Sequence, residues 1–141
     1  MERLRRQEGS NLVEFALVLP LLLVLVMGIV EVGFALYDKA VITNACREGA
    51  RAGMVFRDPR MSPEEIEAVV RNYASAYLVT FGTPNLTIGS SWDDVDGNGV
   101  KSSGDTLTVN VSYLYDYLQL ANLVPGLGQL NIQSTSVMRF E

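Results

Sequence analysis

The chain has 141 residues, enough for one small domain and a membrane anchor. Its net charge of −5 provides no basic face for nucleic acid, so we expect no nucleic-acid partner. It contains no His and one Cys, which excludes an imidazole base, an intrachain disulfide and a Cys-based zinc site within these residues. The sequence also contains no nucleophile–base pair, metal triad or phosphate-binding loop. We therefore expect that the protein is not an enzyme.

A long apolar segment follows a basic start. No charged residue occurs between Phe15 and Val30, and the apolar pattern extends from Leu12 to about Tyr37. A helix of that length reaches about 39 Å, enough to cross a hydrocarbon core of about 30 Å with tilt. Arginines at positions 3, 5 and 6 precede it, and such a flank favours the cytoplasmic side. The sequence predicts a single-pass protein of the cytoplasmic (inner) membrane, with a leader at 1–9, a transmembrane helix at 10–37 and an extracytoplasmic domain at 38–141.

A cleavable secretory signal is the alternative, because residues 33–35 (Gly-Phe-Ala) fit a small-x-small cleavage site. We favour the uncleaved anchor, since the apolar run is long for a signal and the helical pattern continues through Tyr37. In such an anchor we expect Glu31 at the outer membrane interface, where an acid reaches polar surroundings at low cost.

Gly9 ends the basic leader, and Glu14 follows at the start of the apolar helix. This spacing resembles the processing site of type IV pilin-like proteins, in which a prepilin peptidase cuts after the glycine. The resemblance implies cleavage between Gly9 and Ser10, and it implies that Glu14 pairs with the new N-terminal amine of a neighbouring subunit. A carboxylate in an apolar helix is costly alone and tolerable beside a cation. The alternative is that Gly9 merely ends the leader and that Glu14 extends to the interface.

Three segments are similar to TadE-like proteins, the pseudopilins of the tight-adherence (Flp pilus) assembly system. They are Leu12–Pro20, Gly28–Gly33 and Asn44–Ala52, with a weaker similarity from Gly104 to Tyr115. The resemblance implies a minor pilin or pseudopilin that takes part in assembly of a Tad/Flp-type pilus or secretion filament. The partners it implies are the membrane, a prepilin peptidase, other pilin or pseudopilin subunits and the pilus-assembly machinery.

The exported part is predicted to be α+β. The first helix continues to about Phe56, and a second, amphipathic helix begins with Ser62 as N-cap and Glu65 closing a capping box, and ends near Thr80. Strands follow from Leu86, with a period of two over residues 106–113 and a last strand ending near Phe140. The fold expected is a long N-terminal transmembrane helix that continues into a small exported domain, with a second helix and a short antiparallel sheet, as in pilin-type heads.

Two features of the first helix leave alternatives open. Ala45, Gly49 and Gly53 form a strip of small residues that packs either against another helix of the same chain, which we favour, or against another subunit. Cys46 is either a buried, inert thiol, which we favour, or an intersubunit disulfide partner.

An acidic segment at residues 94–105 fits the calcium-loop template except that Asp replaces the final Glu. The ligands that the template predicts are Asp94, Asp96, Asn98, the Val100 carbonyl, Ser102 through a water, and Asp105. The alternative is a solvated connector whose Asp-Gly and Asn-Gly pairs form turns. If the site binds calcium, a membrane-tethered or secreted calcium-binding adhesion or scaffold module is the alternative to a pilus-assembly protein.

Overall fold

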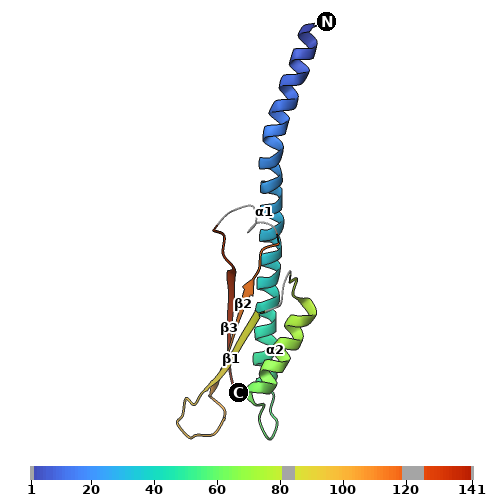
Figure 1. The fold of residues 1–141 in the computed structure, drawn as a ribbon. Helices are drawn as coiled ribbons and strands as arrows, with labels where there is room; N and C mark the ends of the chain where they lie inside the picture. Colours follow the sequence, from blue (N-terminus) through green and yellow to red (C-terminus); the bar gives the residue numbers. More distant parts are fainter. Residues whose placement is uncertain (1, 81–84, 119–125, 141) are drawn as a thin grey trace.

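The computed structural model describes residues 2–80, 85–118 and 126–140, with the side chains of residues 2–10 outside the description. The elements in chain order are α1 (Glu2–Met54), α2 (Pro63–Tyr77), β1 (Asn85–Asp93), β2 (Thr106–Tyr115) and β3 (Leu130–Arg139). Figure 1 shows α1 as a long shaft whose C-terminal half carries the small head formed by the other elements. The expected α+β class, with a long apolar helix, a second helix and an antiparallel sheet, is confirmed.

The sheet has three antiparallel strands in the order β1-β2-β3. Its inner face packs on the helices: α1 lies against β2 and β3, and α2 lies against β1 and α1. The period of two predicted for β2 is observed, and every second residue is buried. These buried residues are Leu107, Val109, Val111, Tyr113 and Tyr115.

The capping box predicted for α2 is present. The Ser62 hydroxyl accepts a hydrogen bond from the Glu65 N–H (3.3 Å), and the Glu65 carboxylate accepts one from the Ser62 N–H (2.8 Å). The helix ends at Tyr77, before the expected Thr80, because Leu78 adopts an extended conformation. The buried stripe consists of Ile66, Val70 and Ala74, which recur every four residues.

The strip of small residues on α1 is an intrachain contact, as favoured from the sequence. A Cβ added to Gly49 would collide with the Cγ2 of Val70, and one added to Gly53 would lie 2.5 Å from the Cδ2 of Leu107. The two glycines therefore allow α2 and the sheet to approach the backbone of α1. By contrast, a Cβ at Gly33 would meet nothing within 4 Å.

We expect the Gly49→Val variant to destabilise the head by about 1–3 kcal/mol, because the added side chain overpacks the contact with α2. The matched control is Gly33→Val, which adds the same side chain to the same helix in open space. Chemical unfolding of the full chain in detergent micelles, followed by the fluorescence of the single Trp92, measures both. Equal midpoints for the two variants would contradict the assignment.

Candidate functional site

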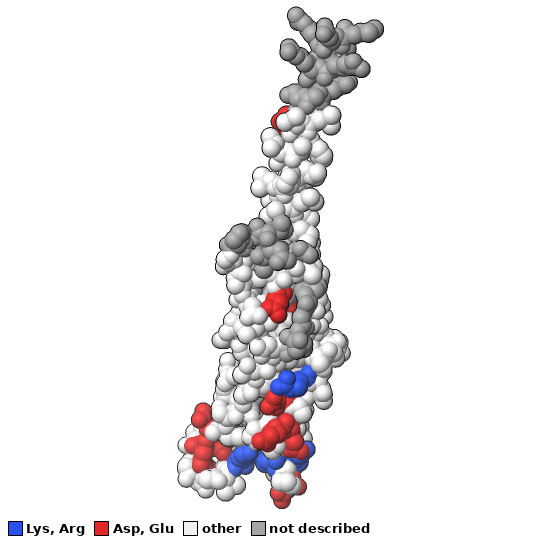
Figure 2. Space-filling model, in the orientation of Figure 1, with Lys and Arg blue, Asp and Glu red and all other residues white. Residues whose placement is uncertain are grey.

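The N-terminal half of α1 stands clear of the head (Figure 2). Its side chains from Leu12 to Val30 are exposed or partly exposed, and none of its most apolar stretch is buried. It lies in the one helix among the described residues that is long and apolar enough to cross a membrane, by length and composition. Full exposure excludes the core helix of a soluble domain, whereas a signal sequence has the same properties.

The predicted processing site lies in this exposed half. Gly9 and Ser10 fall within α1, and their side chains are outside the described set. Glu14 is exposed among apolar neighbours and forms no ion pair with the side chains that the structure describes. Its carboxylate is therefore available to a cation on another molecule.

Two acids on α1 are fully buried against the head. Glu31 and Asp38 are seven residues apart, so they lie on the same face of the helix, and each has 0% of its surface exposed. The burial of Glu31 against the head was not expected from the sequence, and its expected place at the outer membrane interface stays a prediction. One carboxylate oxygen of Asp38 accepts a hydrogen bond from the Val79 N–H at 3.0 Å, which holds the segment after α2 against α1.

Tyrosines from β2 meet these acids inside the head. Burial raises the pKa of the Asp38 carboxyl above its ordinary value, although the Val79 N–H opposes the shift. Burial, and then the charges of Asp38 and Asp116, raise the pKa of Tyr113 to about 12. The pKa of Tyr115 is also raised by burial and by the charges of Glu31 and Asp38. The two phenols therefore stay neutral at physiological pH. Burial disfavours the charged form of the Asp38 carboxyl.

Cys46 is fully buried and contacts two strands. Its Sγ lies 3.0 Å from the Val109 carbonyl and 3.6 Å from the Ser134 carbonyl, with the geometry of weak S–H donation. Burial raises the pKa of the thiol, so the reactive thiolate is disfavoured. These observations support the buried, inert thiol rather than an intersubunit disulfide.

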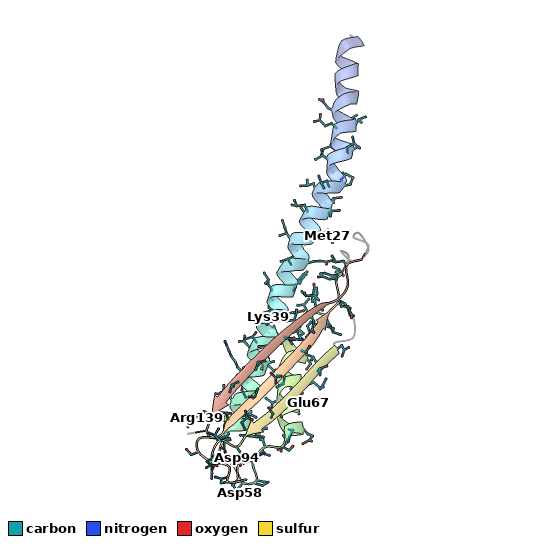
Figure 3. The ribbon with its side chains drawn as sticks, turned by 90° about the vertical axis from the view of Figure 1, so that its left-hand side faces the viewer. Met27, Lys39, Asp58, Glu67, Asp94 and Arg139 are labelled. Atoms are coloured by element: carbon teal, nitrogen blue, oxygen red, sulfur yellow. The ribbon has the colours of Figure 1, made fainter. Side chains whose placement is uncertain are left out.

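The acidic loop lies at the end of the head that is farthest from the N-terminus (Figure 1). Ligand oxygens of Asp94, Asp96 and Asp105 lie within 4.8 Å of one another, so the three carboxylates form a group that could hold a metal ion. Gly99 has φ +74°, which confirms the sharp turn expected at this position of the template. Figure 3 shows Asp94 at this distal end, beside the ends of the strands.

Hydrogen bonds within the loop connect the remaining residues of the template. The Asn98 amide nitrogen donates to Asp96 (2.6 Å) and to the Ser102 hydroxyl (3.0 Å), so these three side chains meet. The Val100 N–H donates to the Asn98 side-chain oxygen (2.6 Å). A cation would need that oxygen turned inward, so calcium binding requires rotation of the Asn98 side chain.

Backbone donors already support two of the acids. The Asp94 carboxylate accepts from the N–H groups of Gly97 and Gly99, each at 2.7 Å, and the Gly99 bond is the main cause of its lowered pKa. Asp105 is 2% exposed and accepts from the Val95 N–H (2.9 Å) and the Ser102 N–H (2.7 Å). The turn is therefore supported by its own backbone as well as by any ion that binds it.

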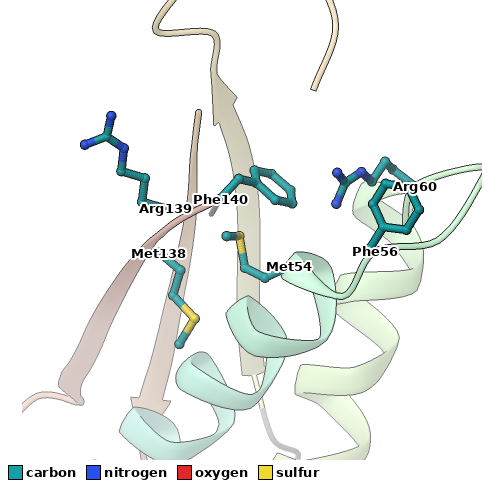
Figure 4. A pocket seen from close by; sticks show the side chains of 6 residues that line it. All are labelled: Met54, Phe56, Arg60, Met138, Arg139 and Phe140. Atoms are coloured by element: carbon teal, nitrogen blue, oxygen red, sulfur yellow. The ribbon is translucent and has the colours of Figure 1, made fainter. Parts of the chain in front are cut away.

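A pocket of about 440 Å³ at the distal end contains an arginine between two aromatic rings (Figure 4). The Arg60 guanidinium carbon lies 4.2 Å from the centroid of the Phe140 ring and 5.0 Å from that of Phe56. Such stacking contributes about 0.5–2 kcal/mol per pair. Arg60 therefore links the connection between α1 and α2 to Phe140, the residue that follows β3.

Comparison with known families identifies the N-terminal segment. Residues 9–51 match the family model of TadE-like proteins. The resemblance seen in the sequence is thereby confirmed over these residues. No curated protein and no solved structure matches the chain.

The TadE-like segment covers both halves of α1. It begins at the predicted cleavage glycine and includes Glu14 in the exposed half. It also includes Glu31, Asp38 and Cys46, which face the head. The acidic loop and the sheet lie outside the match, so the calcium assignment receives no support from the family.

The sequence did not predict that Glu31 and Asp38 are buried, nor that Arg60 stacks on two aromatic rings. The spacing of Glu31 and Asp38, seven residues apart on a helix, was a usable signal for one shared face. Nothing local indicated that Tyr113 and Tyr115, more than seventy positions away, would cover them.

We expect Asp38→Asn to raise the melting temperature of the head at pH 7, because Asn removes the buried charge and keeps an oxygen for the Val79 N–H. The folded state of the natural protein binds the Asp38 proton more tightly than the unfolded state does. Its stability therefore falls as the pH rises from the ordinary pKa of 3.8 through the raised folded value.

The difference between Asp38→Asn and the natural protein should accordingly shrink as the pH is lowered towards 4. Asp93→Asn, an exposed acid at the end of β1, is the matched control. Thermal melts of the full chain in micelles between pH 4 and pH 8 measure the effect. A pH-independent difference would contradict the buried-charge assignment.

Proposed function

We propose that this chain is a TadE-like pseudopilin, or minor pilin, that is inserted in the cytoplasmic membrane by α1 and takes part in assembling a Tad/Flp-type pilus or secretion filament. The observation that carries the proposal is the exposed, apolar half of α1, with the single carboxylate of Glu14 near its start, inside the segment that matches TadE-like proteins. The leader 1–9 lies on the cytoplasmic side, and the head lies outside the membrane.

The contact between head and helix supports a span close to the bilayer thickness. Buried side chains of α1 begin at Glu31 among the described residues, which leaves about residues 12–30 without a buried side chain. At about 1.5 Å per residue this part is about 28 Å long, close to the hydrocarbon thickness of about 30 Å. The same apolar surface suits a bundle of like helices if the subunit leaves the bilayer.

Glu14 gives such a bundle a register. Removal of residues 1–9 by a prepilin peptidase leaves Ser10 as the N-terminal residue, with an ammonium group four positions before Glu14. An amine and a carboxylate of neighbouring subunits neutralise each other in apolar surroundings, where either charge alone is costly. Pairing of unlike groups on different subunits favours a staggered arrangement of helices.

The chemistry of the head is consistent with a structural rather than a catalytic protein. The chain has no His, and the carboxyls of Glu31 and Asp38 on α1 are buried against the head, away from solvent. Charged side chains gather at the distal end of the head, whereas α1 carries no charged side chain from Phe15 to Val30 (Figure 2). This distribution suits a subunit that is anchored by an apolar helix and exposes a polar end on the other side.

The test uses two variants in cells that make the filament. Glu14→Gln keeps the size of the side chain and removes its charge, so membrane insertion and cleavage should persist while recovery in the sheared filament fraction falls about tenfold or more, equivalent to about 1.4 kcal/mol. Gly9→Leu should block cleavage, so that the intact mass of the membrane protein retains the leader.

Gly28→Leu is the control for the second variant, because it makes the same change at a site on α1 where a Cβ meets nothing within 4 Å. Intact-mass spectrometry should give Ser10 as the first residue for the natural protein and the control. A natural protein that begins near Leu36 would indicate a secretory signal, and Glu14→Gln assembling at the natural level would refute the pairing role.

Calcium binding by the acidic loop stays a prediction, and the alternative function, a calcium-dependent adhesion or scaffold module, depends on it. The grouping of Asp94, Asp96 and Asp105 supports it. A divalent cation would reduce the repulsion among these carboxylates, and the closing Asp has a shorter reach than Glu, which predicts weak affinity.

For this loop, we expect millimolar calcium to raise the melting temperature of the full chain in micelles. Asp96→Ala should abolish the shift, because Asp96 is exposed and supports no backbone donor except the Asn98 N–H. Asp93→Ala, just outside the loop, should retain it. No shift in the natural protein would exclude a calcium site.

A further inference from the structure

A groove of about 320 Å³ lies between α1 and the edge strand β3, at the end of the head that is nearer the exposed half of α1. One wall is a single face of the helix, because its residues follow the spacing i, i+3, i+4 and i+7. These residues are Val32, Ala35, Leu36 and Lys39. The other wall is the start of β3, residues 130–133, together with Tyr117. The helical wall begins just after the exposed half, so the groove continues that apolar surface into the head.

Large apolar side chains in the groove stay exposed although they belong to the head. Residues two apart on a strand share a face, and Leu130 lies on the same face of β3 as Ile132, which is buried in the core. Leu130 is nevertheless 40% exposed, and Leu36 on the opposite wall is 66% exposed. Contact of such side chains with water is unfavourable, and no described element covers them. The groove therefore needs an apolar occupant along these residues.

The polarity of the groove changes along its length. Both walls run in the same direction, because α1 and β3 each lead from the exposed half towards the distal end, where Arg139 lies (Figure 3). Leu36 therefore precedes Lys39 on one wall, as Leu130 precedes Gln133 on the other. The Lys39 ammonium donates a hydrogen bond to the Gln133 carbonyl and closes the far end of the groove. An occupant that enters from the exposed half thus meets apolar side chains first and a cation last.

The cation at the far end lacks an acidic partner. Lys39 is the one basic residue between Arg6 and Arg47. It forms no ion pair with the side chains that the structure describes, and its hydrogen bond to Gln133 uses one of the three ammonium donors. Two donors are left for an oxygen anion at the end of the apolar groove. A molecule that matches both ends carries an anionic head on an apolar chain.

We propose that the groove holds one phospholipid of the outer leaflet, with an acyl chain along Val32, Leu36 and Leu130 and the phosphate at Lys39. The acyl chain covers the apolar side chains that the head leaves exposed, and the ammonium pairs with the phosphate. A lipid held in this way fixes the depth of the head at the membrane surface. The site rests on the proposed function, in which the exposed half of α1 crosses the bilayer.

The position of the groove suits the headgroup layer of such a bilayer. The seven residues from Val32 to Lys39 rise about 10 Å along the helix, and the headgroup layer outside the hydrocarbon core is about 5–8 Å thick. Tyr117 lines the groove, and Tyr37 is exposed on α1 next to Leu36. Tyrosine is enriched at this depth of membranes, because its ring is apolar and its hydroxyl is polar. Both walls therefore carry residues typical of a membrane interface.

Native mass spectrometry of the full chain counts the lipids that stay bound after the protein leaves neutral detergent micelles. The micelles contain dioleoylphosphatidylglycerol or, for comparison, dioleoylglycerol, which has the same acyl chains and no phosphate. We expect one bound phosphatidylglycerol per chain and about fivefold less retention of the diacylglycerol, because one basic residue near an anionic lipid changes affinity by about that factor.

Lys39→Gln removes the charge and keeps an N–H donor for the Gln133 carbonyl, so the head should stay folded while retention of phosphatidylglycerol falls about fivefold. Lys101→Gln is the matched control, because it makes the same change beside the acidic loop, outside the groove. Leu36→Ala should also reduce retention, because it shortens the apolar wall. Leu25→Ala, the same change in the exposed half of α1, should leave retention at the natural level.

Equal retention of the two lipids would overturn the proposal, as would retention of phosphatidylglycerol by Lys39→Gln at the natural level. A dimer without bound lipid that Leu36→Ala abolishes would assign the groove to a second copy of the chain and also overturn it. Failure of the proposed function is distinguished from these results. A cellular protein that begins near Leu36 would contradict the membrane anchor, and it would leave the binding measured with the full chain in micelles unchanged.

Discussion

The structure depends on one constraint: half of α1 is apolar and has no partner among the residues that the structure describes. From Leu12 to Val30 the helix exposes an apolar surface, and contact of this surface with water is unfavourable. The helix therefore needs a bilayer or other apolar helices around it. None of the described elements of the head buries this half.

The other half of α1 is the centre of the head. Small residues on it, at Ala45, Gly49 and Gly53, allow α2 and the sheet to approach closely. The buried carboxyls of Glu31 and Asp38 lie on the same helix at the end nearer the exposed half. In the proposed function, the close packing keeps helix and head as one unit, so that movement of the helix from bilayer to filament carries the head with it.

Much of the fold could be predicted because its signals are local. The capping box of Ser62 and Glu65, the alternation in β2 and the uncharged run in α1 each lie within a few neighbouring residues. The three-dimensional grouping of the acids in the loop followed from a template with fixed spacing. The TadE-like match over residues 9–51 rests on the same kind of local pattern.

What could not be predicted depends on contacts between distant parts of the chain. Nothing near Glu31 in the sequence indicates that Tyr115 of β2 lies close enough for the Glu31 charge to raise its pKa. Arg60 looks like a loop cation until Phe140 stacks on it.

The depth of α1 in a bilayer tests the account most directly. In a Cys46→Ala background, single cysteines replace Leu21 in the exposed half and Arg51 beside the head, and each carries a nitroxide spin label in lipid vesicles. Leu21 is 71% exposed in the isolated chain, so a label there reports its surroundings rather than the head. The account predicts that dissolved oxygen relaxes the Leu21 label and a water-soluble nickel chelate relaxes the Arg51 label. Equal relaxation of both labels by the nickel chelate would contradict it.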